Sequence, residues 1–375
     1  MDTQEKTIKN GEYSKNINLH VAEPSFDTPT QIIEMMPKVL HKGFTHYSST
    51  MGLESFRTSI SSFYKKEFNV RIDPSKEIIP TNGAGEGLYL ILASLFEPED
   101  EIIIPNPTYH GFVKKVEHSY LTPVFVPMFE QDTVNFNFRA INDAITDKTK
   151  AIYICNPNNP TGTILTKREM DEISITLEKN PSINLIVDKC YSRILYDGVV
   201  YKEFLKYEKV RNQLLVVDSF SKTYAMTGWR IGYIIGSEPN LKRIMETAFD
   251  VRSSVNTAVQ EVAARAINLD ESIVDAMVHE YSKRRDIVLS FLKKHNINFI
   301  NPLGGFEVFA DVSRFGLSSL EFSERLKKTV NVEVVPGSEF GPDGEGYIRI
   351  VFCASEENLL EGLDRINKFI EYLKR

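Results

Sequence analysis

The amino-acid sequence predicts an α/β protein in which a large, mostly parallel sheet is wrapped by helices and joined to a smaller α+β domain. Two observations support this fold class. From about residue 75 to residue 236, short β-branched runs alternate with helical patterns, which is typical of parallel strands joined by helices. Beyond about residue 255 the segments are longer and amphipathic, which indicates a second, smaller unit.

The elements of the large unit follow one another along the chain. The helical pattern GLYLILASLF comes before the strand-like runs EIIIP, PVFVPM and KAIYIC. The helical pattern REMDEISITLEK then comes before the runs NLIVD, QLLVVDS and RIGYIIG. Each run is short, apolar and bounded by turn-forming residues, so we expect these runs to be the strands of one sheet.

The second unit mixes helices and strands. Its predicted helices are TAVQEVAARAIN, SIVDAMVHEYSKRRDIVLSFLKKH and the terminal EENLLEGLDRINKFIEYLKR, and its predicted strands are GFEVFADV and GYIRIVF. No internal repeat and no Ser/Gly-rich linker divides the chain, so the two domains are expected to be closely joined. We predict a large domain over residues 40–265 and a small domain formed by residues 1–39 and 266–375.

Composition narrows the possible partners of the chain. With 375 residues, 42% of them hydrophobic and 25% charged, the composition is that of an ordinary globular protein. The net charge of −7 disfavours nucleic acid or an anionic membrane as the main partner. Cys155, Cys190 and Cys353 are odd in number and form no CxxC pair, so neither a disulfide framework nor a metal site is expected. The polar N-terminus and the lack of a long apolar run predict a cytoplasmic protein.

Five loops combine small and polar residues directly after apolar runs. In open α/β sheets, ligands bind outside the carboxyl ends of the strands, so these loops are the expected walls of a single pocket. They are TNGAGEG at 81–87, PNPTYHG at 105–111, NPNNPTG at 156–162, DKCY at 188–191 and DSFSKTYAMTGWR at 218–230.

The last of these loops places a primary amine beside groups that suit phosphate. Ser219, Ser221, Lys222 and Arg230 come together between the runs QLLVV and RIGYIIG. Serine hydroxyls and the arginine fork suit phosphate oxygens, and a partly desolvated lysine can condense with a carbonyl. An aldehyde that carries a phosphate fits both properties. The alternative is a polar surface loop with a solvated lysine.

A carboxylate ends the apolar run NLIV. Asp188 would be costly to bury there without a cationic or hydrogen-bonding partner. A protonated pyridine nitrogen would be such a partner, and the paired ring would withdraw electrons from the carbon next to an imine. An aspartate that caps the following helix is the alternative.

Other loop residues suit the same ligand. The turn NPNNPTG could direct the Asn159 amide inward, where with the Tyr191 hydroxyl it would hydrogen-bond a phenolate oxygen. The backbone of Ala84 and Gly85 opens a helical pattern whose N-terminus favours an anion. Tyr109 could stack on a flat ring. Without a ligand, the first segment would remain a good turn and the two tyrosines ordinary core or surface residues.

An arginine lies in the middle of the late strand GYIRIVF. Arg349 has apolar neighbours on both sides and is costly there unless it meets an anion. A substrate carboxylate held by a bidentate pair would satisfy it. A structural salt bridge to a protein carboxylate is the alternative.

Taken together, NPNNPTG, IVDKCY, SFSKTYAMTGWRIGY and YIRIVF resemble motifs of the class I/II aminotransferases of the fold type I pyridoxal-phosphate enzymes. The resemblance begins at LHVAEPSFDTP, continues through HYSSTMGLESFR, and covers nearly the whole chain with the motifs in family order. It implies a seven-stranded sheet in the large, cofactor-binding domain. It also implies transfer of an amino group between an L-amino acid and a 2-oxo acid, with pyridoxal 5'-phosphate as cofactor.

The resemblance implies a role for each candidate residue. Lys222 matches the Schiff-base lysine and general base, Asp188 the partner of the pyridine nitrogen, and Tyr109 the stacking aromatic. Asn159 and Tyr191 match the pair that contacts the ring oxygen, so the implied catalytic residues are Lys222, Asp188 and Tyr191.

Phosphate and substrate contacts are implied in the same way. The phosphate cradle would consist of the backbone at Ala84 and Gly85, the hydroxyls of Ser219 and Ser221, and the side chain of Arg230. Arg349 matches the arginine that grips the substrate α-carboxylate. Substrate contacts are also expected at Asn159 and Ala22. Tyr47 resembles the tyrosine that reaches the phosphate of a neighbouring subunit, which implies a homodimer with shared active sites.

Three positions depart from the family pattern. Ala22 replaces a usual glycine, Lys189 a usual glutamate, and Glu307 the tyrosine of the frequent GAFY or GGFY motif. These positions are expected near the substrate side, where Glu307 would favour a cationic or polar substrate side chain. The alternative for Glu307 is a side chain that points to solvent.

Other functions share part of the pattern. A lyase or cyclase would use the same cofactor and the same activated carbon, but release ammonia instead of passing it to an oxo acid. An amino-acid sensor of the regulator type would need a DNA-binding extension, and the match already begins near residue 19. A nicotinamide-dependent oxidoreductase would need a GxGxxG fingerprint, which Leu88 interrupts.

Overall fold

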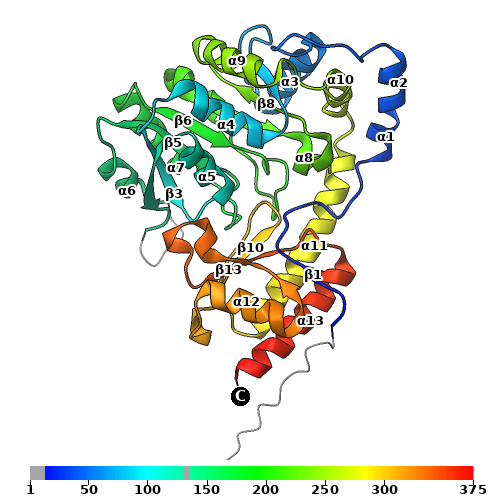
Figure 1. Ribbon diagram of the computed structural model, residues 1–375, viewed down its shortest axis with the longest axis vertical. Coiled ribbons are helices and arrows are strands. Elements are labelled where there is room, and N and C mark those ends of the chain that lie inside the picture. Colours follow the sequence, from blue (N-terminus) through cyan, green and yellow to red (C-terminus); the bar gives the residue numbers. More distant parts are fainter. Residues whose placement is uncertain (1–12, 131–135, 375) are drawn as a thin grey trace, which may run out of the picture.

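The computed structural model describes residues 13–130 and 136–374 and has two parts (Figure 1). The upper part in this view contains a large sheet covered by helices, and the lower part contains a small sheet packed against further helices. No helix among these residues is long and apolar enough to cross a membrane.

The large sheet has seven strands in the order β2-β8-β7-β6-β5-β3-β4. All neighbours are parallel except β8, which is antiparallel to both β2 and β7, so β2 and β7 run in the same direction. The predicted fold class, with a mostly parallel sheet of seven strands, is therefore confirmed. The strands are β2 (Ile78–Thr81), β3 (Glu101–Asn106), β4 (Thr122–Pro127), β5 (Thr149–Cys155), β6 (Asn184–Asp188), β7 (Leu214–Ser219) and β8 (Gly232–Ile235).

The central strands are apolar on both faces because helices cover both sides of the sheet. In β6, Leu185 and Val187 belong to one hydrophobic cluster while Ile186 belongs to another. This pattern is typical of a buried parallel strand. It also explains why the strands appear in the sequence as continuous apolar runs.

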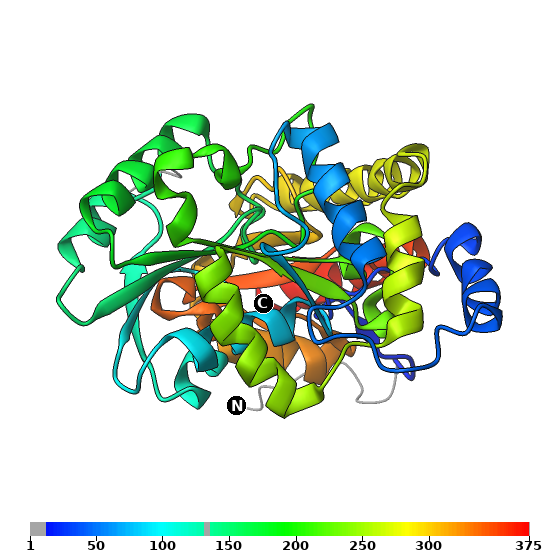
Figure 2. The same cartoon turned by 90° about the horizontal axis from the view of Figure 1, so that it is seen from above.

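Two helical layers lie on opposite sides of the sheet (Figure 2). One layer contains α4 (Ala84–Leu95), α5 (His110–His118) and α9 (Glu238–Arg252). The other contains α3 (Glu54–Phe68), α6 (Phe138–Asp143), α7 (Lys167–Lys179) and α10 (Thr257–Ala266).

The small part is built on an antiparallel sheet in the order β12-β13-β10-β9. A separate parallel pair, β1 with β11, attaches the N-terminal segment to it. Its strands are β1 (Ile17–Asn18), β9 (Phe299–Ile300), β10 (Glu307–Asp311), β11 (Val332–Glu333), β12 (Val335–Pro336) and β13 (Tyr347–Val351). Its helices are α11 (Ser272–Lys294), α12 (Ser319–Val330) and α13 (Glu356–Leu373).

Two regions connect the parts. Helices α1 (Thr30–Ile33) and α2 (Met35–His41) begin before residue 40, but their Ile32 and Val39 pack into a cluster of the large sheet. Near the start of helix α11, Val274 belongs to that same cluster, whereas Met277 belongs to the core of the small part. The division into 40–265 and the remainder stays a prediction, because the packing changes gradually over these helices.

The direction of the strands places the candidate loops together. Strands β2, β3, β5, β6 and β7 run the same way, so their carboxyl ends lie at one edge of the large sheet. The five loops singled out in the sequence follow these five strands. The last loop is not entirely irregular, because it contains the short helix α8 (Phe220–Thr223) and a 3₁₀ turn at Thr227–Trp229.

Candidate active site

A cavity of about 510 Å³ lies at this edge of the large sheet and is also bounded by residues of the N-terminal segment and the small sheet. Every candidate residue except Tyr47 lines it. These residues are Ala22, Ala84, Gly85, Tyr109, Asn159, Asp188, Tyr191, Ser219, Ser221, Lys222, Arg230 and Arg349.

Asp188 is the last residue of β6, and its buried carboxylate faces the cavity. Its oxygens accept hydrogen bonds from the Cys190 backbone N–H at 3.2 Å and the Tyr153 hydroxyl at 3.3 Å. Burial raises the pKa of Asp188, and these hydrogen bonds oppose the rise only in part. Within the described residues, no cation forms an ion pair with it. A ring N–H that carries positive charge therefore fits this position.

Lys222 brings a primary amine into the same cavity. It lies on α8, which begins directly after β7, so the strand and the helix together set the position of its Cα. Its Nζ donates to the Ala22 carbonyl oxygen, and no carboxylate of the described residues forms an ion pair with it. A single backbone acceptor leaves this amine available to a carbonyl compound.

The N-terminus of α4 and Arg230 form an anion site. Gly83 has a φ of +80°, and a Cβ at this residue would lie 2.5 Å from Arg230 Nη2, so only glycine allows the guanidinium to approach this closely. Arg230 donates to Thr227 O at 2.8 Å and Asn82 O at 3.0 Å. With the free N–H groups of Ala84 and Gly85, this cradle suits a phosphate.

The two serines complete the cradle from the other side of the same loop. Ser219 ends β7 and Ser221 lies on α8, and both are buried at the cavity wall. The Ser219 backbone N–H is held by Asp218 Oδ1 at 2.7 Å, which fixes the turn from strand to helix. A phosphate group at this position would meet hydroxyl, backbone and guanidinium donors together.

Arg349 projects into the cavity from β13 of the small sheet. Its Nη1 donates to Asn159 Oδ1 at 3.0 Å and its Nη2 to the His20 carbonyl oxygen, while its buried Nε has no acceptor among the described residues. None of the ion pairs in the described part of the chain includes this side chain, so the structural salt bridge is not found there. A substrate carboxylate fits the unused N–H.

The two aromatic candidates differ in their surroundings. Tyr109 precedes α5, and burial raises the pKa of its hydroxyl to about 12. Tyr191 follows β6 by three residues, and its hydroxyl donates to Glu307 Oε1 at 2.7 Å. Both rings line the cavity, where one can stack on a flat ligand and the other can contact its edge.

The prediction that Lys189 and Glu307 lie on the substrate side is wrong. Neither lines the cavity. Lys189 is 1% exposed, pairs with Glu203 at 2.5 Å, and lies over the rings of Tyr64, Phe68 and Tyr201.

Glu307 is 0% exposed and accepts the Tyr191 O–H. Both of the proposed environments for Glu307, a cationic substrate side chain and solvent, are therefore excluded. Each side chain is held by a partner from another part of the sequence. Glu203 is 14 residues from Lys189, and Tyr191 is 116 residues from Glu307.

Tyr47 lies outside the cavity, in the segment between α2 and α3, and is 90% exposed. It borders a groove of about 1030 Å³ that also contains Leu40, Phe44 and Val255. Its role toward a neighbouring subunit stays a prediction.

Several lining residues were not singled out in the sequence. His20, His110, Cys190, Thr227 and Glu339 face the cavity as well. Burial, followed by the charge of Arg349, lowers the pKa of His110. Three of the five candidate loops contain His110, Cys190 and Thr227. Their position in the same loops as predicted residues could have identified them. His20 lies in LHVAEPSFDTP, two residues before the predicted Ala22, whereas Glu339 comes from a segment with no such signal.

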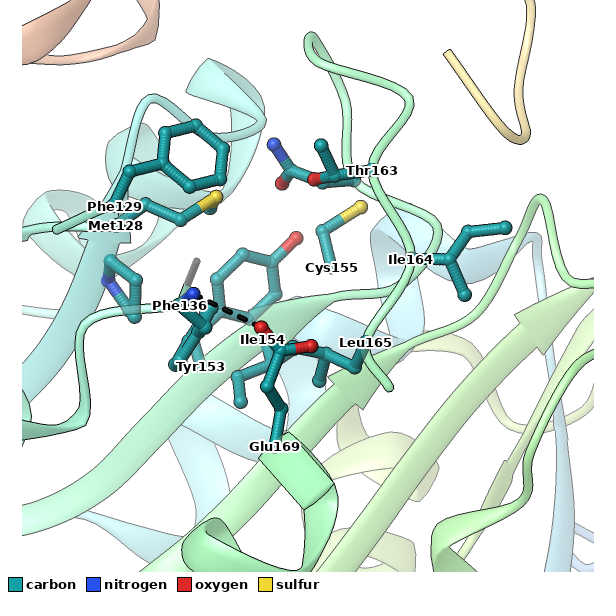
Figure 3. Close-up of a pocket in the computed structure, with 12 residues that line it drawn as sticks. Met128, Phe129, Phe136, Tyr153, Ile154, Cys155, Thr163, Ile164, Leu165 and Glu169 are labelled. Atoms are coloured by element: carbon teal, nitrogen blue, oxygen red, sulfur yellow. Dashed lines mark hydrogen bonds between the residues drawn. The ribbon is translucent and has the colours of Figure 1, made fainter. Parts of the chain in front are cut away.

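A second cavity lies beside β5 and is shown in Figure 3. Met128, Phe136, Tyr153 and Leu165 contribute to its wall, and Glu169 Oε1 accepts a hydrogen bond from the Phe136 backbone at 3.0 Å. Its volume is about 30 Å³, which is the space of about one water molecule. This cavity is too small for a substrate.

Comparison with known proteins agrees with this geometry. A family model described as aminotransferase class I and II matches residues 14–366. An aromatic-amino-acid aminotransferase of Thermococcus litoralis is 33% identical over 360 residues, which cover 96% of this chain and 92% of that protein. An aspartate aminotransferase of Pyrococcus horikoshii is 35% identical over 358 residues, covering 95% of this chain and 90% of that one.

Solved structures show the same similarity. The crystal structure of an aromatic aminotransferase from Pyrococcus horikoshii superimposes with a TM-score of 0.93 at 32% identity and covers 96% of both chains. The aspartate aminotransferase from Thermus thermophilus with maleate has a TM-score of 0.89 at 28% identity, covering 94% of this chain and 91% of that one.

Proposed function

Because the chain belongs to the class I and II aminotransferases, we propose that it moves amino groups with pyridoxal 5'-phosphate held covalently through Lys222. It is a transaminase of the EC 2.6.1 type, which transfers an amino group between an amino acid and a 2-oxo acid. The observation that supports the cofactor most strongly concerns Asp188. This buried carboxylate has no ion-pair partner in the described part of the chain, and it shares a cavity with the amine of Lys222.

The residues of the cavity fit the three parts of this cofactor. Asp188 would pair with the ring nitrogen, and Tyr109 would stack on the ring. Asn159 and Tyr191 would contact the ring oxygen. The phosphate would lie at Ala84, Gly85, Ser219, Ser221 and Arg230. When bound, the cofactor supplies an aldehyde that condenses with amines and a protonated ring that withdraws electrons from the substrate Cα.

Lys222 would provide the proton transfers of the reaction. Once a substrate amine has replaced it, its Nζ is free to accept the proton from the substrate Cα as a general base. The same Nζ then returns the proton to the carbon that receives the amino group. Beside a positively charged ring N–H, the ionised form of Asp188 would be favoured, and it would in turn favour the protonated ring.

Arg349 would orient the substrate for this proton transfer. Its guanidinium is held by Asn159 and the His20 carbonyl, so its position is set before the substrate binds. The α-carboxylate would bind at the unused Nε–H and a neighbouring N–H group in a bidentate pair. Arg349 would thereby hold the substrate by its α-carboxylate while Lys222 acts on the Cα proton.

A second copy of the chain would complete the site. We propose a homodimer in which Tyr47 of each subunit reaches the phosphate bound by the other. The exposure of Tyr47 and the apolar groove formed with Leu40, Phe44 and Val255 support this assembly, because a water-exposed surface of this kind is typical of an interface.

Borohydride reduction of the purified protein tests the proposal. We expect a pyridoxyl adduct on Lys222, and we expect Lys222→Ala to lose the visible absorption and nearly all turnover. Lys114→Ala, which removes an exposed lysine of α5, should keep both. Titration with a panel of amino acids should convert the cofactor to its aminated form, with turnover only when an oxo acid is added. An adduct on another lysine, or steady transamination by Lys222→Ala, would exclude the assignment.

The same titration separates transamination from the alternative chemistry of this cofactor. A lyase would release ammonia and a keto product from a single amino acid without any oxo acid. A transaminase instead stops after one half-reaction. Release of ammonia at the rate of turnover would identify elimination as the main reaction.

A further inference from the structure

The hydroxyl of Tyr191 has one proton, and the structure shows where that proton is directed. The O–H donates to Glu307 Oε1 at 2.7 Å. A phenol donates one hydrogen bond and accepts through its lone pairs. While this bond is present, Tyr191 cannot donate a second hydrogen bond into the cavity that its ring lines.

Glu307 is built into the fold as an acceptor. It is the first residue of β10 and is 0% exposed. Its second oxygen, Oε2, accepts the Phe306 backbone N–H at 2.7 Å. Gly305 has a φ of +80°, and a Cβ there would lie 2.7 Å from the same Oε2, so glycine leaves room for the carboxylate. Each oxygen of Glu307 thus accepts one hydrogen bond from a neighbouring donor.

The surrounding charges keep the proton on the tyrosine. Burial, followed by the negative charge of Glu307, raises the pKa of Tyr191 well above its usual value, while Arg349 opposes this rise. Cys155 is a further titratable neighbour of Tyr191, and Tyr196 and Cys353 lie near Glu307. Burial raises the pKa of all three, so they stay neutral.

Asn159 differs from Tyr191 because it can donate hydrogen bonds into the cavity. Its Oδ1 accepts the hydrogen bond from Arg349 Nη1 at 3.0 Å. With Oδ1 engaged by Arg349, the N–H groups of the amide are the ones that can donate to a ligand. The two residues that would contact the ring oxygen of the cofactor are thus one donor and one acceptor.

We propose that Glu307 is a positioning residue: it accepts the hydrogen bond of the Tyr191 O–H, so that Tyr191 is left as an acceptor, with Asn159 as the donor, at the cofactor's ring oxygen. This inference rests on the proposed function. It concerns how strongly the ring oxygen holds the proton that it shares with the nitrogen of Lys222. A donor at that oxygen stabilises the anion and releases the proton more easily. An acceptor backed by a carboxylate has the reverse effect.

The pH titration of the visible absorption of the loaded protein measures this property directly. In Glu307→Leu, Tyr191 is free to donate to the ring oxygen, so we expect the titration midpoint to fall by about one pH unit, the effect of one hydrogen bond. Glu307→Gln removes the charge and keeps an acceptor for the Phe306 N–H. It should lower the midpoint in the same direction, and it tests the proposal even where the leucine variant does not fold.

A double-mutant cycle shows which group accepts the hydrogen bond of the Tyr191 O–H. Tyr191→Phe in the wild-type background should not raise the midpoint, because no donor is lost. Tyr191→Phe in the Glu307→Leu or Glu307→Gln background should raise it by about one unit, because the released donor is then removed. Tyr196→Phe is the matched control, since this buried hydroxyl donates to the Gly305 carbonyl at 2.7 Å, and its loss should leave the midpoint unchanged.

The outcomes are distinguishable from failure of the proposed function. A rise of about one unit on Tyr191→Phe in the wild type would show that Tyr191 donates to the cofactor, and the inference would be wrong. An unchanged midpoint in both Glu307 variants would also overturn it. Absence of any visible band and of the Lys222 adduct in the wild-type protein would instead contradict the cofactor assignment.

Discussion

At the scale of the single residue, the burial of Asp188 determines which ligand its carboxylate can bind. Its carboxylate lies at the end of an apolar strand and receives two long hydrogen bonds but no ion pair within the described residues. Burial therefore raises its pKa in the free protein. A protonated ring nitrogen would reverse this effect, because an adjacent positive charge favours the ionised carboxylate.

Asp188→Asn tests this role. The amide still accepts the Cys190 N–H, so the fold should be kept, but it cannot hold the ring protonated by charge. We expect kcat to fall by about 10²- to 10³-fold, the usual effect of removing one preorganised electrostatic contact. Half-reaction kinetics with a single amino acid would measure it, and Asp143→Asn, on exposed α6, is the control. Normal proton abstraction in Asp188→Asn would remove Asp188 from the mechanism.

At the scale of the element, the turn after β6 separates two adjacent charges. Asp188 faces the cavity, whereas Lys189 points into the aromatic core formed by Tyr64, Phe68 and Tyr201 and pairs with Glu203. Glu203 precedes the 3₁₀ helix Phe204–Lys206, so this ion pair fastens the segment after β6 to the large core. Removing one partner would leave a buried charge without compensation.

Lys189→Met should therefore lower the free energy of unfolding by about 3 to 5 kcal/mol, because Glu203 loses its partner. The double variant Lys189→Met with Glu203→Leu should recover most of this loss, since both charges are gone. Urea unfolding followed by circular dichroism would measure both. Lys66→Met, which breaks an exposed pair with Glu271, should change stability little. A single variant as stable as the wild type would contradict this account.

At the scale of the whole molecule, the cavity requires both parts of the chain. Strands β5, β6 and β7 supply Asn159, Asp188 and the loop with Lys222, whereas β13 supplies Arg349 and the N-terminal segment supplies Ala22. Arg349 bonds to Asn159 across this boundary. The two parts are thus joined at the position where the substrate carboxylate would bind.

The proposed homodimer is tested by a change in Tyr47. Tyr47→Phe removes only a hydroxyl, so the mass in solution should remain that of a dimer. Cofactor affinity should fall by about 10- to 100-fold, which corresponds to one hydrogen bond to a charged group. Light scattering and titration of the apoprotein with cofactor measure the two properties. Tyr120→Phe, which alters another exposed tyrosine, is the control. A wild-type monomer with full cofactor affinity would exclude shared sites.

The sequence by itself determined the succession of strands and helices along the chain and the chemical character of the loops. Alternating apolar runs, each followed by polar or small residues, are local signals, and the parallel direction of the strands brings their ends to one edge. Asp188 and Lys222 could therefore be assigned to one cavity from the sequence. His110, which lies in one of the same loops, was not predicted, although the same rule could have found it.

Only the tertiary structure decided which charges face the cavity and which are buried elsewhere. Lys189 and Glu307 were expected near the substrate, but neither lines the cavity. Lys189 pairs with Glu203, and Glu307 is buried behind Tyr191, a residue of the cavity wall. Contacts between remote segments depend on how the helices, sheets and turns pack together, and a local pattern of residues contains no information on that packing. The direction of the Tyr191 proton is a property of this kind.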